Sequence, residues 1–149
     1  MKHFGPIVTL VARIAIGALL VAAGALKIGH AAELASAIAG FRLLPAALIP
    51  LLALVLPFFE VLLGLYLLAG LFSRVAAWIA AVQFALYAAA IASAVLRGIP
   101  ANCGCFGPSD AAAADWPHVV MDAALAILCV ALAMRAPGAW ALDERMQSR

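Results

Sequence analysis

The chain has 149 residues, of which 68% are hydrophobic and 11% are charged, and its formal net charge is +2 at pH 7. A soluble domain is about half apolar and about one quarter charged, so this composition excludes a soluble fold and makes the lipid bilayer the solvent. The small, scattered charge gives no basis for binding nucleic acid. Three cysteines exclude a scaffold of several disulfides, because they allow at most one internal bridge.

Four apolar stretches are each long enough to cross a bilayer, which takes about 20 helical residues. They cover about residues 6–26, 46–71, 75–96 and 116–134 and predict an all-α fold, a single four-helix transmembrane bundle over residues 1–149. The first stretch has features of a signal peptide, but its length and the internal Arg13 predict an uncleaved helix. We also expect a short interfacial helix over residues 31–41 and a frayed polar tail over residues 135–149.

Two charged residues lie inside predicted spans, Arg13 in the first and Glu60 in the second. A charge at that depth is costly unless it finds a partner or reaches the interface. Arg13 therefore either snorkels toward the cytoplasmic face or pairs with Glu60, and Glu60 is either paired in this way or neutral and hydrogen-bonded. A buried pair would fix the helix register, and the alternative for Glu60 is a proton-handling or quinone-contacting role. Gly17 and Gly24 leave flat patches where another helix can approach closely.

Other polar residues occupy defined positions on the predicted helices. Lys27 ends the first span, where it can cap the last carbonyls or reach lipid headgroups. Gln83 and Tyr87 lie four apart on one face of the third span and can supply interhelical hydrogen bonds. His118 and Asp122 lie four apart near the start of the fourth span, and we expect Asp122 to pair or to accept a hydrogen bond.

The distribution of Lys and Arg between the two sides of the bundle predicts its orientation. Four spans place both termini on one side. That side holds five basic residues and the opposite side three, respectively Lys2, Arg74, Arg135, Arg145 and Arg149, and Lys27, Arg42 and Arg97. The positive side normally faces the cytoplasm. We therefore expect a bacterial inner-membrane protein with cytoplasmic termini and a periplasmic loop between the third and fourth spans.

That loop holds Cys103 and Cys105, separated by Gly104. Cysteines at i and i+2 meet the distance for a disulfide only in a bend, which glycine eases. Strained, exposed disulfides exchange readily, so we favour electron exchange with a partner. Metal binding, a structural bridge and two unrelated thiols stay open, although zinc sites prefer two residues between cysteines. Cys129 lies within an apolar helix and is expected to behave as a small hydrophobe.

These residues resemble the MauE/DoxX-type family of redox-associated membrane proteins, and the resemblance covers nearly the whole chain. Its most specific element is the Cys-x-Cys-Phe-Gly segment that begins at Cys103. The weaker matching positions are Arg13, Gly24 to Lys27, Leu44-Pro45, Pro57, Glu60, Arg97-Gly98, Trp116 and Asp122. Met121 departs from the family pattern, in which arginine is common.

The resemblance implies a four-helix bundle similar to DoxX and, more distantly, to quinone-linked disulfide-forming proteins. It also implies a role in maturing a periplasmic disulfide-rich protein, which for MauE is the small subunit of methylamine dehydrogenase, together with a thioredoxin-like partner. A quinone is then a candidate cofactor, and no metal is expected.

Our leading hypothesis is thiol-disulfide exchange in the membrane, with Cys103 and Cys105 as the reacting pair and a periplasmic thioredoxin-fold protein or disulfide-containing client as partner. One alternative is a non-enzymatic assembly factor or anchor, in which the cysteines only brace the loop. A small transporter or metal-handling protein is a third hypothesis, and Arg13, Glu60 and Gln83 would then mark a polar pathway.

Overall fold

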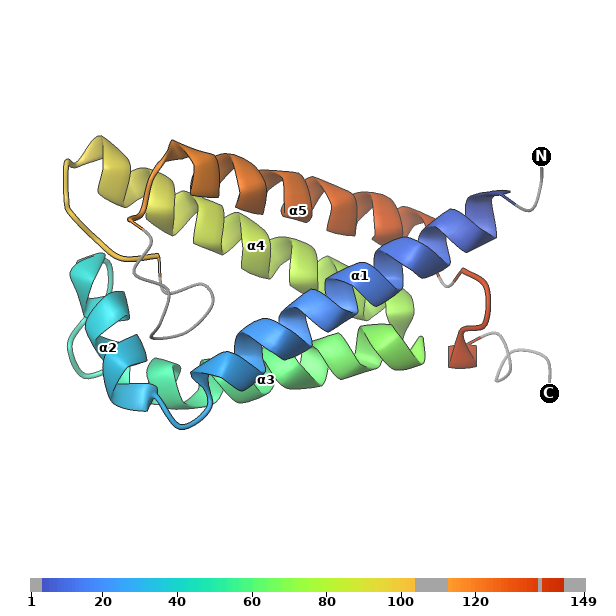
Figure 1. Ribbon diagram of the computed structural model, residues 1–149, viewed down its shortest axis with the longest axis horizontal. Coiled ribbons are helices and arrows are strands. Elements are labelled where there is room, and N and C mark those ends of the chain that lie inside the picture. The colour runs from blue at the N-terminus through green and yellow to red at the C-terminus, as the bar shows by residue number, and fades with distance from the viewer. Residues whose placement is uncertain (1–3, 104–112, 137, 144–149) are drawn as a thin grey trace.

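The computed structural model describes residues 4–103, 113–136 and 138–143. These residues form five α-helices: α1 (Phe4–Lys27), α2 (Ala31–Gly40), α3 (Ile49–Ala69), α4 (Ser73–Leu96) and α5 (Trp116–Arg135). Figure 1 shows α2 and the connection between α4 and α5 at one end of the bundle, with both chain termini at the other. The short α2 lies across the end of the bundle instead of extending it.

The four long helices are each long and apolar enough to span a membrane. Many of their large apolar side chains face outward, and Leu86, Leu96 and Ile127 are 64%, 74% and 71% exposed. Such a surface suits lipid and not water. The predicted fold class is therefore confirmed, and the chain is a multi-pass helical membrane protein. The expected interfacial helix is α2, which has no buried residue.

Helices α1 and α3 pack against each other through glycines. A Cβ atom added to Gly64 would lie 2.6 Å from the carbonyl oxygen of Gly17, and one added to Gly24 would lie 2.6 Å from the carbonyl oxygen of Pro57. No side chain fits at these points, so the two backbones approach as closely as small residues permit. The contacts also fix the antiparallel register, because Gly24 lies beside Pro57 and Gly17 beside Gly64.

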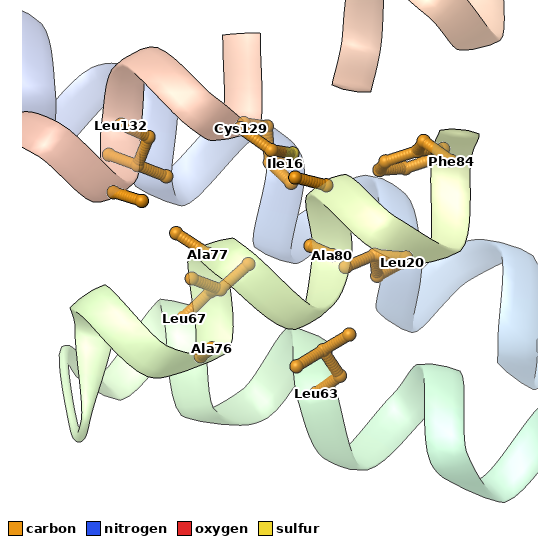
Figure 2. Close-up of a cluster of buried hydrophobic side chains, with 12 residues drawn as sticks. Ile16, Leu20, Leu63, Leu67, Ala76, Ala77, Ala80, Phe84, Cys129 and Leu132 are labelled. Atoms are coloured by element: carbon orange, nitrogen blue, oxygen red, sulfur yellow. The ribbon is translucent and has the colours of Figure 1, made fainter. Parts of the chain in front are cut away.

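Helices α4 and α5 form the second antiparallel pair, and buried alanines of α4 face the core shared by the long helices. Ala76, Ala77, Ala80 and Ala81 of α4 are all buried in the same apolar core. Figure 2 shows that this core takes side chains from all four long helices, including Ile16 of α1, Leu63 of α3 and Cys129 of α5. Cys129 is free and fully buried, as its apolar surroundings in the sequence predicted.

The segment after α5 folds back onto the bundle, so the prediction of a frayed tail is wrong for residues 138–143. The Asp143 carboxylate accepts hydrogen bonds from the backbone N–H groups of Phe72 and Ser73, at 2.7 and 2.8 Å. These N–H groups lie at the start of α4, where backbone donors have no partner within the helix. An acidic side chain placed there can accept their hydrogen bonds. Ala141 is buried beneath this contact.

At the opposite end, one contact joins α2 to the connection between α4 and α5, and a second contact lies within that connection. The Arg97 guanidinium donates a hydrogen bond to the carbonyl oxygen of Phe41, just after α2. The backbone N–H of Ala114 donates to the carbonyl oxygen of Ala101 at 2.8 Å. The second contact closes the base of the loop that carries the cysteines. It therefore fixes the point at which the chain enters the loop, next to Cys103.

The glycine contact between α1 and α3 gives a direct test of this packing. Substituting Gly64→Ala should lower the free energy of unfolding by about 1–3 kcal/mol, because the added methyl group forces the two backbones apart. Gly5→Ala is the matched control, since a Cβ there meets nothing within 4 Å. Denaturant titration of the purified protein in mixed micelles measures both changes. An equal effect of the two substitutions would contradict the close approach of α1 and α3.

Candidate functional site

The centre of the bundle holds a buried polar cluster built around the Glu60 carboxylate of α3. The Lys27 ammonium donates to Oε1 and Oε2 of Glu60 at 2.9 and 2.8 Å. Gln83 Nε2 donates to Oε1 at 3.1 Å, and the Tyr87 hydroxyl donates to the same oxygen at 2.6 Å. Lys27 is 3% exposed and Glu60 1%, so the cluster joins α1, α3 and α4 inside the apolar bundle.

All the partners of Glu60 act as donors, and an ionised carboxylate is an acceptor-only group. The arrangement therefore fits the charged form of Glu60, with Lys27 as its counter-ion. The ammonium also lies 5.8 Å from the centre of the Tyr87 ring, within the range of a cation–π contact. A buried charge of either sign needs such a partner.

This cluster corrects two predictions. Lys27 does not reach headgroups, because its side chain turns inward to pair with Glu60. Arg13 is not the partner of Glu60, because it precedes Lys27 by 14 residues of α1, which is about 21 Å along a helix. The glycine register explains the outcome, since it places the end of α1 beside the middle of α3.

Arg13 lies at the other end of α1, where it is buried beside the C-terminal segment. Its Nη2 donates to the carbonyl oxygen of Ala139 at 3.5 Å. Gly70 caps the end of α3 in the left-handed region, with φ at 69°. A Cβ there would lie 2.7 Å from Nη1 of Arg13. Arg13 therefore ties the segment after α5 to α1 and does not take part in the central cluster.

The interhelical hydrogen bonds expected of Gln83 and Tyr87 are present, and they fix the orientation of the Gln83 amide. Its Nε2 donates to Glu60 and also to the Tyr87 hydroxyl at 3.0 Å. The side facing an ionised carboxylate must be the NH₂ group, because a carboxylate offers no proton. Oε1 of Gln83 is then left buried without a hydrogen-bond partner among the described residues.

A large apolar cavity of about 690 Å³ opens beside the cluster. Lys27, Gln83 and Tyr87 are its polar lining groups from the cluster, and Cys103 also lines it. The remaining walls come from α2, α3, α4 and the segment between α2 and α3, and include Leu34, Phe41, Leu52, Phe59 and Leu86. Several of these lining residues also lie on the apolar outer surface of the bundle, so the cavity opens toward the bilayer. Its volume is in the range of small-molecule sites.

The structure places Cys103 at this cavity and records it as disulfide-bonded. Its partner sulfur, and with it the predicted role of Cys105, lies outside the described residues. Within the described part of the chain, no group of three His, Cys, Asp or Glu side chains is arranged to hold a metal ion.

The start of α5 carries a second set of polar groups. Asp115 caps the helix by accepting hydrogen bonds from the backbone N–H and the ring Nδ1 of His118. The side-chain hydrogen bond from His118 holds the pKa of Asp115 below its ordinary value. Asp122 lies one turn deeper, is buried, and interacts electrostatically with His118 and Lys27. Its Oδ2 has no hydrogen-bond partner among the described residues, and the expectation that Asp122 pairs or accepts a hydrogen bond stays a prediction.

Comparison with known proteins gives the same family that the cysteine segment suggests. Residues 5–135 match the family described as methylamine utilisation protein MauE. The chain belongs to the MauE family. It is 34% identical over 135 residues to the methylamine utilization protein MauE of Paracoccus denitrificans, covering 90% of this chain and 73% of that protein. No solved structure matches the chain.

Sequence reasoning on this MauE-family chain missed the pairing of Lys27 with Glu60. Gly24, Pro57 and Glu60 carried a signal for this pair. Gly24 lies one helical turn before Lys27 and marks the face of α1 that contacts α3, so Lys27 lies on that same face. Sequence reasoning also missed the cavity, which depends on where α2 lies across the end of the bundle. No local pattern specifies that position.

A double-mutant cycle tests the central pair. Lys27→Met should lower the free energy of unfolding by about 3–5 kcal/mol, since it leaves the buried Glu60 carboxylate without its counter-charge. Glu60→Leu in the same chain should restore much of that loss. Arg13→Met and Glu60→Leu should instead be additive within about 0.5 kcal/mol. Denaturant titration in micelles measures the wild type, the three single variants and the two double variants. Strong coupling of Arg13 and not Lys27 to Glu60 would contradict the cluster.

Proposed function

We propose that this chain is a membrane thiol-disulfide exchange factor of methylamine utilisation, with Cys103 and Cys105 as the reacting pair. In the proposed reaction the disulfide accepts two electrons and two protons from a partner dithiol. The partner becomes a disulfide, and Cys103 and Cys105 become thiols. The observation that carries the proposal is a disulfide-bonded Cys103 beside an apolar cavity that opens to lipid.

The position of Cys103 supports exchange over simple bracing of the loop. The contact between Ala101 and Ala114 already closes the loop base without help from sulfur. Cys103 is half-buried, in contrast to the fully buried Cys129. Reactive cysteines occupy partly exposed positions, whereas buried structural ones are inert.

The partner that fits this chemistry is a thioredoxin-fold protein, or the disulfide-rich client itself, on the periplasmic side. The bias of basic residues favours cytoplasmic termini and therefore a periplasmic cysteine loop. Disulfides form and persist in the periplasm, whereas cytosolic thiols are kept reduced. The names of the family and of its Paracoccus member point to methylamine utilisation as the process served.

Trapping of a mixed disulfide tests the proposal. The oxidised protein in lipid nanodiscs is mixed with a reduced thioredoxin whose resolving cysteine has been replaced. The wild type should give a mixed disulfide, and Cys103→Ala and Cys105→Ala should each lose it, because neither variant can form the disulfide that the thioredoxin thiolate attacks. Non-reducing gels and mass spectrometry measure the adduct.

Cys129→Ala is the control and should behave as the wild type, since its thiol is buried away from the loop. If Cys103→Ala and Cys105→Ala both leave trapping and thioredoxin oxidation unchanged, the exchange proposal is wrong. The chain would then act as an assembly factor or anchor.

A further inference from the structure

We propose that the cavity beside α2 is a binding site for an anionic phospholipid. An acyl chain of the lipid fills the cavity, and Arg42 and Arg97 bind the headgroup at its rim. The lipid belongs to the leaflet on the side of α2. This site does not depend on disulfide exchange at Cys103, so the two proposals can fail separately.

The walls of the cavity favour hydrocarbon over a polar ligand. Lys27, Gln83 and Tyr87 line it, but each of them donates a hydrogen bond to Glu60. Apart from Cys103, the other lining side chains are apolar. Protein interiors hold few voids larger than a water molecule, and apolar cavities stay dry. A cavity of about 690 Å³ that opens toward the bilayer is therefore filled by lipid tails.

The cavity is elongated along the helices, as an extended acyl chain requires. Figure 1 shows α3 and α4 close together near the chain termini and further apart toward α2. The lining residues of α4 extend from Ile79 to Ile91, which is about 18 Å of helix. Those of α3 extend from Leu52 to Phe59. A lipid tail that runs parallel to the two helices fits this shape.

Two arginines lie at the end of the cavity that faces the lipid headgroups, on either side of Phe41. Phe41 lines the cavity. Arg42 follows it in the chain, and the Arg97 guanidinium donates to its carbonyl oxygen. Both arginines are exposed, and within the described part of the chain neither forms an ion pair with a carboxylate. Guanidinium groups bind phosphate oxygens well, so this rim suits an anionic headgroup.

The guanidinium of Arg97 keeps donors for such a headgroup. Arginine carries five N–H donors. Two hydrogen bonds of Arg97 go to backbone carbonyl oxygens, those of Ser93 and Phe41. These bonds hold the guanidinium beside the cavity, and its remaining donors are available to a phosphate group.

The backbone of Arg42 gives an independent reason to assign it a ligand. Its φ is 52°, and it directly follows Phe41, the C-cap of α2. Glycine is the usual residue at this position, because other residues are strained there. The Arg42 side chain makes no hydrogen bond to the described residues, so no contact among them accounts for an arginine. Strained residues cluster at ligand clamps, and a bound phosphate accounts for this one.

Three variants remove parts of the site, and two matched variants serve as controls. Arg42→Gly and Arg97→Gln each remove one guanidinium. Ala90→Phe places a ring in the cavity, because Ala90 lines it. Ala89→Phe puts the same ring on a neighbouring exposed position of α4 that does not line the cavity. Arg135→Gln removes an exposed arginine at the end of α5 near the chain termini.

Native mass spectrometry of the full-length protein in detergent measures binding of dioleoylphosphatidylglycerol and, separately, dioleoylphosphatidylcholine. The wild type should bind the first anionic lipid about tenfold or more tightly than the zwitterionic one. Arg42→Gly and Arg97→Gln should each weaken binding of the anionic lipid about fivefold. Ala90→Phe should weaken binding of both lipids about tenfold or more. Ala89→Phe and Arg135→Gln should stay within about twofold of the wild type.

Thermal unfolding in the same detergent without added lipid separates binding from folding. Arg42→Gly should be at least as stable as the wild type, because glycine adopts a positive φ without strain. Equal wild-type affinity for the two lipids would overturn the headgroup site, as would unchanged phosphatidylglycerol affinity in Arg42→Gly. Unchanged affinity in a folded Ala90→Phe would overturn the acyl-chain site. The arginine variants test the proposal whether or not Ala90→Phe folds.

Discussion

The ion pair between Lys27 and Glu60 is the constraint on which the rest of this bundle depends. A carboxylate in the middle of an apolar helix is tolerated only with a counter-charge and with donors for its remaining lone pairs. Here α1 supplies the ammonium and α4 supplies an amide and a hydroxyl. Three helices that share few other polar contacts are thereby held in one relative register.

The pair in turn depends on residues that carry no charge. Gly17, Gly24 and Gly64 allow α1 and α3 to touch backbone to backbone, and this approach brings Lys27 within reach of Glu60. Helix α2 lies across the end of the bundle, where Phe41 and Leu34 line one side of the cavity. The disulfide-bonded Cys103 lies at the open end.

Much of the fold could be predicted from the sequence, because bilayer thickness sets the length of every span. The four long helices and α2 lie within a few residues of their predicted positions. The partner of Glu60 could not be predicted from depth alone, since Arg13 and Lys27 lie on the same helix and only the glycine register distinguishes them. The ordered segment that ends at Asp143 was missed because it leads into a tail whose last residues, 143–149, are mostly polar. Its order comes from a distant contact with the start of α4.

The charge state of Glu60 tests the central claim most directly. Infrared spectra of the wild type and of Glu60→Gln in lipid nanodiscs at neutral pH isolate the contribution of this one carboxyl group. An ion pair with Lys27 predicts that the variant loses intensity in the stretching bands of an ionised carboxylate. Loss of a protonated carboxyl band instead would show that Glu60 is neutral and would contradict the buried ion pair.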